Sequence, residues 1–152
     1  ANLMGFVKRY VPPVLGRRYD YPKGFQRTLH PLDHFFGDCT ILVEGPLDAL
    51  WLHQHGYTGA LAVLGSGLTR SQLLWVRRNT SNVTLAFDND REGRSGQEKV
   101  VQQLAGVRTS VVDLPSKVKD IQELSKEELK IVMENTVSAL FSSRKGYSRI
   151  GE

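Results

Sequence analysis

Short runs of apolar and β-branched residues recur from residue 39 onward, and a more polar segment with helical spacing follows each of them. Runs this short suit strands that are buried on both faces of a parallel sheet. Strand and helix alternate four times, which predicts an α/β fold with a Rossmann-like central parallel four-stranded sheet flanked by helices. The predicted strands cover residues 40–43, 60–64, 83–87 and 107–112, and the predicted helices cover residues 48–55, 69–78, 92–104 and 125–141.

Acidic residues follow two of the predicted strands. Right-handed crossovers place the carboxyl end of every parallel strand at one edge of the sheet, where sites form in open α/β folds. Glu44 follows the first strand, and Asp88 and Asp90 follow the third. A single aspartate there is as readily a turn residue or a helix cap, but a glutamate after a buried run has no role in a core. Together the three carboxylates would repel one another, and a hard divalent cation such as Mg²⁺ removes that repulsion.

Residues 1–38 form an irregular basic lead. Four prolines and four glycines within it break helices and interior strands, so we expect no regular structure beyond a short strand or hairpin between residues 3 and 11. Asp20 is the only acid among the first 30 residues, where six basic residues lie. We therefore divide the chain into the lead, an α/β domain at 39–124, and a C-terminal helix with a frayed tail at 125–152.

Composition bounds the function without identifying it. The chain has 152 residues, 40% of them apolar and 24% charged, which suits one globular domain. No apolar run reaches the roughly 20 residues that a membrane helix needs, so we expect no membrane partner. Cys39, the single cysteine, fits a cytoplasmic protein and is expected to be a small buried residue entering a strand. Since the first residue is not Met, we expect a fragment of a longer protein.

The acidic motif and its surroundings resemble a known family. The runs Val43–Asp48, Leu64–Gly67 and Phe87–Arg94 are similar in order and placement to the pattern of the Toprim domain, which primases, topoisomerases, some nucleases and recombination proteins share. The segments after the second and fourth strands, together with the lead, resemble bacterial-type DNA primases. The resemblance thus implies the Toprim fold and a primase-like catalytic core.

The resemblance also implies roles for particular residues. Glu44, Asp88 and Asp90 would be catalytic and would bind Mg²⁺ or Mn²⁺, with Asp48 as a supporting acid. The expected partners are a single-stranded DNA template, nucleoside triphosphates and a replicative helicase. The residues expected to contact phosphate or nucleotide are Lys119, Asp120, Arg91 and Arg94, and those expected to contact nucleic acid are Arg9, Arg17, Arg18, Tyr19 and Lys23.

Three functions remain open at this stage. The first is a metal-dependent nucleotidyltransferase core that synthesises primers on single-stranded DNA, and as an isolated fragment it is not assured of activity. The second is a nuclease or topoisomerase-like DNA-processing domain, because Asp90 to Gly93 is closer to the topoisomerase version of the motif. The third is a non-catalytic DNA-binding module. We expect Trp51 and Trp75 to be core residues, and we expect no zinc at His30 and His34, because Pro31 interrupts the helix that their spacing would need.

Overall fold

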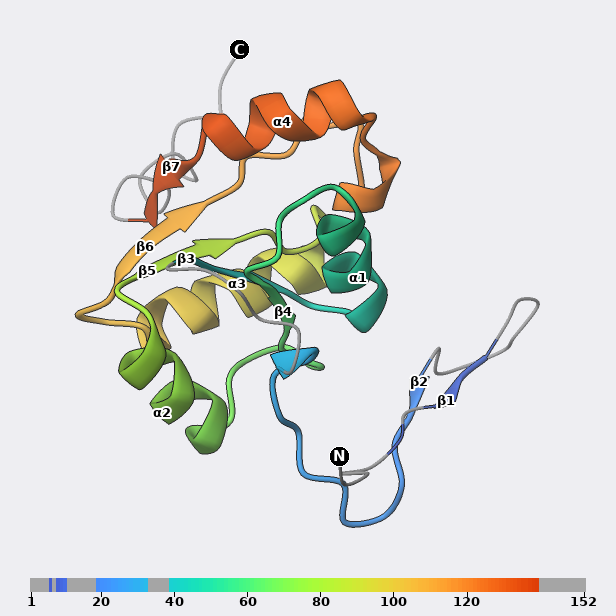
Figure 1. Ribbon diagram of the computed structural model, residues 1–152, viewed down its shortest axis with the longest axis vertical. Coiled ribbons are helices and arrows are strands. Elements are labelled where there is room, and N and C mark those ends of the chain that lie inside the picture. The colour runs from blue at the N-terminus through green and yellow to red at the C-terminus, as the bar shows by residue number, and fades with distance from the viewer. Residues whose placement is uncertain (1–5, 7, 11–18, 33–38, 140–152) are drawn as a thin grey trace.

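A five-stranded sheet forms the centre of the molecule (Figure 1). The computed structural model describes residues 6, 8–10, 19–32 and 39–139. The strand order is β4-β3-β5-β6-β7, and all neighbours are parallel except β6 and β7. The strands are β3 (Cys39–Val43), β4 (Ala60–Ala62), β5 (Asn82–Leu85), β6 (Arg108–Val111) and β7 (Val137–Ser138).

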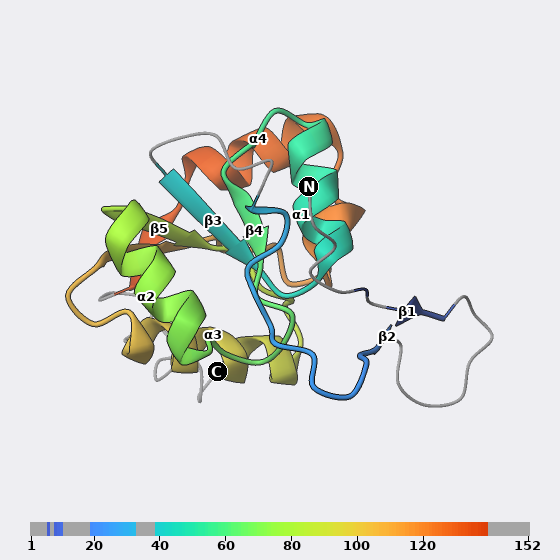
Figure 2. The same ribbon diagram turned by 60° about the horizontal axis from the view of Figure 1, so that its bottom comes forward.

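Helices cover both faces of this sheet. Alternating side chains of each strand point to opposite faces, so that Leu42 packs in one core cluster while Ile41 and Val43 pack in the other. Helices α1 and α4 lie on the Ile41 face, and α2 and α3 lie on the Leu42 face (Figures 1 and 2). The helices are α1 (Pro46–Gln54), α2 (Arg70–Asn79), α3 (Arg91–Gln103) and α4 (Lys126–Glu134), with a 3₁₀ turn η2 at Ile121–Glu123.

The predicted α/β fold and its four parallel strands are confirmed, but the predicted C-terminal helix is too long. Helix α4 ends at Glu134, Asn135 caps it, and the chain then enters β7. Val137 pairs with Val111 in an antiparallel register, which adds a fifth strand to the exposed edge of β6. The β-branched Val137 suits a strand better than a helix. Residues 140 and 141 lie outside the described residues.

Two expectations about single residues have different outcomes. Cys39 enters β3 as predicted but is exposed rather than buried, because it is the first residue of the strand and burial begins only at Thr40. Trp51 and Trp75 do pack against the two core clusters.

Within the described part of the chain, no helix is long and apolar enough to cross a membrane.

The described part of the lead forms a small hairpin and an extended segment. Strand β1 (Lys8–Arg9) lies within the expected short strand or hairpin at 3–11 and pairs antiparallel with β2 (Tyr19–Asp20), farther along the chain. Both views show the hairpin standing beside the sheet (Figures 1 and 2). Residues 21–32 return to the sheet, where His30 forms a bridge to Ala62 on the outer edge of β4.

Candidate active site

The carboxyl ends of β3 and β5 are direct neighbours. Leu42 of β3 pairs with Leu85 of β5, whereas β4 lies on the far side of β3. The connection from β3 to β4 thus leads to one side and the next connection leads back past β3, which makes the β3–β5 gap a topological switch point. Ligands bind at such points in open α/β sheets. Glu44 and Asp88 emerge there, and Glu44 Oε1 accepts the main-chain N–H of Asp88 at 3.1 Å.

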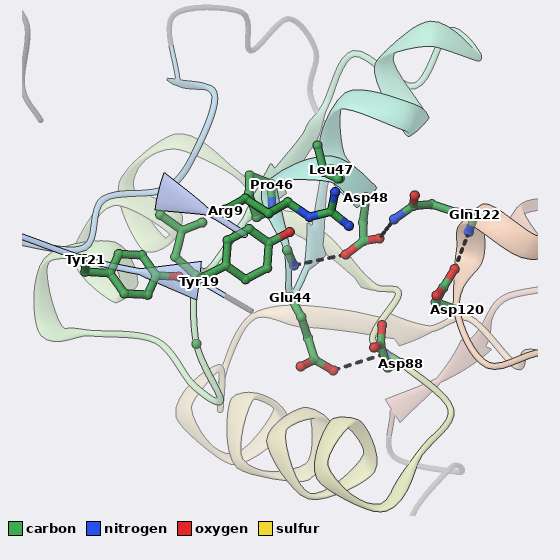
Figure 3. A pocket seen from close by; sticks show the side chains of 13 residues that line it. Arg9, Tyr19, Tyr21, Glu44, Pro46, Leu47, Asp48, Asp88, Asp120 and Gln122 are labelled. Carbon is green, nitrogen blue, oxygen red and sulfur yellow. Dashed lines mark hydrogen bonds between the residues drawn. The ribbon is translucent and has the colours of Figure 1, made fainter. Parts of the chain in front are cut away.

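A pocket of about 240 Å³ opens at this switch point (Figure 3). Carboxylates gather in it from the ends of β3 and β5, from α1 and from the segment after β6. The lead contributes a basic and two aromatic side chains, which lie on the opposite side of the view from Asp120 and Gln122. The acidic lining residues are Glu44, Asp48, Asp88 and Asp120, and those from the lead are Arg9, Tyr19 and Tyr21.

Burial and mutual repulsion favour the protonated forms of two of these acids. The pKa of Glu44 rises from 4.5 to about 7, first because the carboxylate is desolvated and then because Asp88 is close. The pKa of Asp88 rises from 3.8 to about 6, again through desolvation and then through the charges of Asp48 and Asp120. Lys119 lowers the pKa of Asp88 but does not offset burial and the neighbouring acids, so the pocket disfavours the anionic forms of both residues.

Asp48 and Asp120 are held by hydrogen bonds, whereas Asp88 is not. Asp48 is 9% exposed, its Oδ2 accepts the N–H of Gly45 at 3.1 Å, and its Oδ1 accepts a hydrogen bond from Gln122. Burial nonetheless raises the pKa of Asp48. Asp120 Oδ1 caps η2 by accepting the N–H of Gln122 at 2.9 Å. The carboxylate of Asp88 accepts no hydrogen bond from the residues that the structure describes, so its oxygens are available to a ligand.

Asp90 lies beside the pocket rather than in its lining. Its Oδ1 accepts the N–H of Gly93 at 2.9 Å and thereby caps α3. Its Oδ2 lies 3.9 Å from Lys119 Nζ, and both side chains are about half exposed. An exposed pair of this kind contributes little to stability, so either group remains able to turn toward a ligand.

Of the predicted phosphate contacts, Asp120 lines the pocket, whereas Lys119, Arg91 and Arg94 do not. Arg91 is the exposed first residue of α3. Arg94 Nη2 donates to the main-chain oxygen of Asn89 at 3.1 Å and to its Oδ1 at 2.9 Å. Lys23 is exposed and does not line the pocket, and Arg17 and Arg18 lie outside the described residues. Of the predicted nucleic-acid contacts, Arg9 and Tyr19 do line the pocket.

Sequence reasoning missed Gln122, which lines the pocket and binds Asp48. The two residues are 74 positions apart, and no spacing pattern in a single sequence connects them. Sequence reasoning also gave no role to Gly93, whose missing side chain leaves room for the acidic pair. A Cβ at Gly93 would lie 2.2 Å from Asp88 O and 2.6 Å from Glu44 Oε1.

The donor set of the pocket fits a magnesium ion. Among the described residues, no three His, Cys, Asp or Glu side chains already form a group that could hold a metal. Mg²⁺ does not need such a group, since it is commonly bound by one or two carboxylates together with water and substrate phosphates. Glu44 and Asp88 supply two carboxylates whose repulsion a divalent cation would relieve.

Comparison with known proteins identifies the class. Residues 41–125, which contain every strand end of the site, match the family described as Toprim-like. The chain therefore belongs to the Toprim-like family. Its Toprim domain is of the kind found in the catalytic core of DnaG-type bacterial DNA primases, to which the chain is homologous.

Three relatives define the extent of this likeness. The DNA primase of Clostridium acetobutylicum is 33% identical over 110 residues, which are 68% of this chain and 18% of that primase. The Aquifex aeolicus primase structure of the zinc-binding and RNA polymerase domains is 28% identical with a TM-score of 0.76, over 96% of this chain and 40% of that one. A DnaG primase catalytic domain bound to single-stranded DNA is 24% identical with a TM-score of 0.72, over 97% and 52%. The chain thus spans less than a fifth of the first relative.

The raised pKa values predict that the metal-free chain loses stability as pH rises. Glu44 and Asp88 bind protons more tightly when folded than when unfolded, so the free energy of unfolding falls between about pH 4 and pH 7. Glu44→Gln keeps an Oε1 acceptor for Asp88 N–H and removes the charge. With chelator present, we expect this variant to exceed the wild type by about 1 kcal/mol at pH 8, allowing for partial exposure, and to show no gain at pH 4. Urea unfolding at both pH values measures the difference. Glu98→Gln, an exposed acid on α3, is the control, and an equal gain there would contradict the account.

Two glycines of α3 provide a matched test of the space beside Glu44. Gly93→Ala should displace Glu44 and strain the turn at Asp88, since its Cβ meets both at less than 3.0 Å. We expect a loss of about 1–3 kcal/mol in the free energy of unfolding. Gly96→Ala places its Cβ at 3.5 Å from Phe87 and Ser66, an ordinary contact, and should gain up to about 1 kcal/mol from helix propensity. Denaturant unfolding compares them, and equal effects would refute the proposed crowding at Gly93.

Proposed function

We propose that this chain carries the nucleotidyltransferase centre of a DNA primase, which joins nucleotides on a single-stranded DNA template. The observation that carries the proposal is the convergence of Glu44 and Asp88 at the β3–β5 switch point, opposite an Arg9 and Tyr19 hairpin. The homology to DnaG-type catalytic cores supports it, and so does the related catalytic domain that is bound to single-stranded DNA.

In this proposal Glu44, Asp88 and Asp90 hold one or two Mg²⁺ ions, directly or through water, with Asp48 in support. When bound, the metal would neutralise charge that develops on the transferring phosphoryl group. The carboxylate of Asp88 supplies unshared oxygens, and Glu44 is oriented by the N–H that it accepts from Asp88. Asp48 caps the start of α1 through Gly45 and ties this helix to η2 through Gln122.

The basic and aromatic residues would orient the substrates. Lys119 and Arg91 precede and follow acids of the site along the chain, next to Asp120 and Asp90, and their exposed cationic groups suit triphosphate oxygens. Asp120, at the pocket wall, and Arg94 complete the predicted phosphate contacts. Tyr19 offers a ring on which a base can stack, with Arg9 6.0 Å from its centroid. Lys23, Arg17 and Arg18 would contact template phosphates in a sequence-independent manner. A replicative helicase remains the expected protein partner.

Magnesium should reverse the effect of the acidic pair on stability. At pH 8 we expect Mg²⁺ to stabilise the wild type by about 2.7 kcal/mol at one hundred times its dissociation constant. Asp88→Asn should be more stable than the wild type in chelator and should lose most of the stabilisation by Mg²⁺. Asp113→Asn, an exposed aspartate after β6, should keep it. Thermal unfolding with and without Mg²⁺ measures both effects. Equal stabilisation of the three proteins would mean that Asp88 does not bind the ion.

Primer synthesis tests the proposal itself. The chain is supplied with single-stranded DNA, labelled ribonucleotides and Mg²⁺ or Mn²⁺, with deoxynucleotides in a parallel reaction. We expect metal-dependent oligomers whose rate falls at least about a hundredfold in Asp88→Asn and stays unchanged in Asp113→Asn. Degradation of the template by the wild type would instead indicate a nuclease or topoisomerase-like domain, a class that the topoisomerase-like run Asp90–Gly93 favours. Binding of DNA without either product, unchanged by Asp88→Asn, would indicate a non-catalytic module.

A further inference from the structure

The lead contacts the sheet along the outer edge of β4. His30 donates its N–H to Ala62 O at 3.1 Å, and Ala62 donates to His30 O at 2.7 Å. Arg27 Nη1 reaches Leu64 O at 3.3 Å. Residues 27–30 therefore run antiparallel to the end of β4, and the preceding residues lead directly to the pocket that Leu64 helps to line.

One buried side chain links this segment to the rest of the domain. Gln72 of α2 is only 2% exposed. Its Nε2 donates to Thr28 O at 3.1 Å and to Val63 O at 2.9 Å, while its Oε1 accepts the N–H of Thr69 at 2.8 Å. A carboxamide has two N–H donors and one oxygen, and here each is used on a different segment: the lead, the end of β4 and the start of α2.

Gln72 and Leu29 hold the lead in different ways, one through directional hydrogen bonds and the other through apolar burial. Leu29 is 2% exposed and packs in the core cluster of Leu42 and Val63. Such apolar burial is strong but non-directional. A buried N–H without an acceptor is costly, so a shift of the lead that removed Thr28 O from Gln72 is opposed even if Leu29 stays buried.

The register matters because the pocket is completed by residues of the lead that precede this segment. Tyr21 lines the pocket and stacks on Phe25, with ring centroids 5.2 Å apart. Tyr19 reaches the other wall, where a Cβ at Gly45 would lie 3.9 Å from its hydroxyl oxygen. We propose that Gln72 is a positioning residue, whose carboxamide sets the register of residues 27–30 on β4 and so holds Arg9, Tyr19 and Tyr21 at the acidic pocket. Only the reaction that these residues serve rests on the proposed function.

The structural test uses Gln72→Met in the full chain, since methionine has similar size and helix propensity but no N–H donor. We expect the amides of His30 and Ala62 to exchange with solvent faster by about tenfold or more, while those of β5 stay unchanged. We also expect the wild type to show a nuclear Overhauser contact between the Tyr19 ring and Gly45, and we expect this contact to weaken in Gln72→Met. Gln72→Glu is the second variant, because it retains an acceptor for Thr69 N–H and cannot donate to Thr28 O and Val63 O at once.

The matched control is Gln103→Met. Gln103 accepts the N–H of Leu68 at 2.9 Å and donates to its oxygen at 2.8 Å, so it clasps the same β4–α2 connection without touching the lead. The proposal is overturned if exchange and the Tyr19 contact are unchanged in Gln72→Met, if Gln103→Met alters them equally, or if the wild type lacks the contact. If neither Gln72 variant folds while Gln103→Met does, the proposal is also overturned, because Gln72 is then needed for folding rather than for positioning the lead.

A functional measurement separates positioning from stability. In primer synthesis by folded protein, Gln72→Met should raise KM for the nucleoside triphosphate by about tenfold, with little change in kcat or in Mn²⁺ affinity, since the acids do not move. An unchanged KM alongside accelerated exchange would refute the positioning role. If the wild type makes no primers, the proposed function fails, whereas exchange and the Tyr19 contact still decide what Gln72 does.

Discussion

The site depends on the parallel pairing of β3 with β5. Each of these strands is followed by a carboxylate, and at both positions the surroundings disfavour the anionic form. Glu44 and Asp88 follow paired strands, so the ladder that stabilises the sheet also fixes their separation. Their pKa values are raised to about 7 and about 6, because the fold does not compensate the burial of the two carboxylates and their repulsion by neighbouring acids. Repulsion held in place by a rigid sheet is a means of binding a divalent cation, and the other features of the site serve that arrangement.

The acids around the switch point are not equivalent, and their hydrogen bonds distinguish them. Asp48 and Asp120 are engaged by Gln122, and Asp90 caps α3. These bonds shape the elements that surround the pocket. Asp88 has no such bond within the described part of the chain, and Glu44 has one. A cluster that looks uniform in composition is therefore divided between residues that build the site and residues that present oxygen atoms to it.

The sequence predicts those features of the site that depend on residues close together along the chain. Period and composition locate the four parallel strands, and the acids at their ends identify the edge that holds the site. Neither the strand order, which makes β3 and β5 neighbours, nor the bond between Gln122 and Asp48 follows from periodicity, because both depend on contacts between distant segments. The short strand β7 was missed since two residues after a helix carry too weak a pattern, and its partner edge on β6 selects it. The cap that Asp90 forms on α3 could not be told from a ligand role in the sequence, because an aspartate after a strand suits both, and its role as a ligand stays a prediction.

The lead differs clearly from the α/β domain in composition, but its side chains pack into the cores of that domain. Proline, glycine and basic residues set it apart in the sequence, yet Leu29 lies in the core and Tyr21 and Phe25 pack against the opposite cluster. A segment with so little regular structure cannot position its own side chains through repeating main-chain bonds. It must take its geometry from the sheet edge on which it lies. The few directional contacts there, at His30, Arg27 and Gln72, therefore carry a larger part of the site's geometry than their number suggests. An acidic pocket made by a rigid sheet can in this way be matched to basic and aromatic residues from an irregular segment.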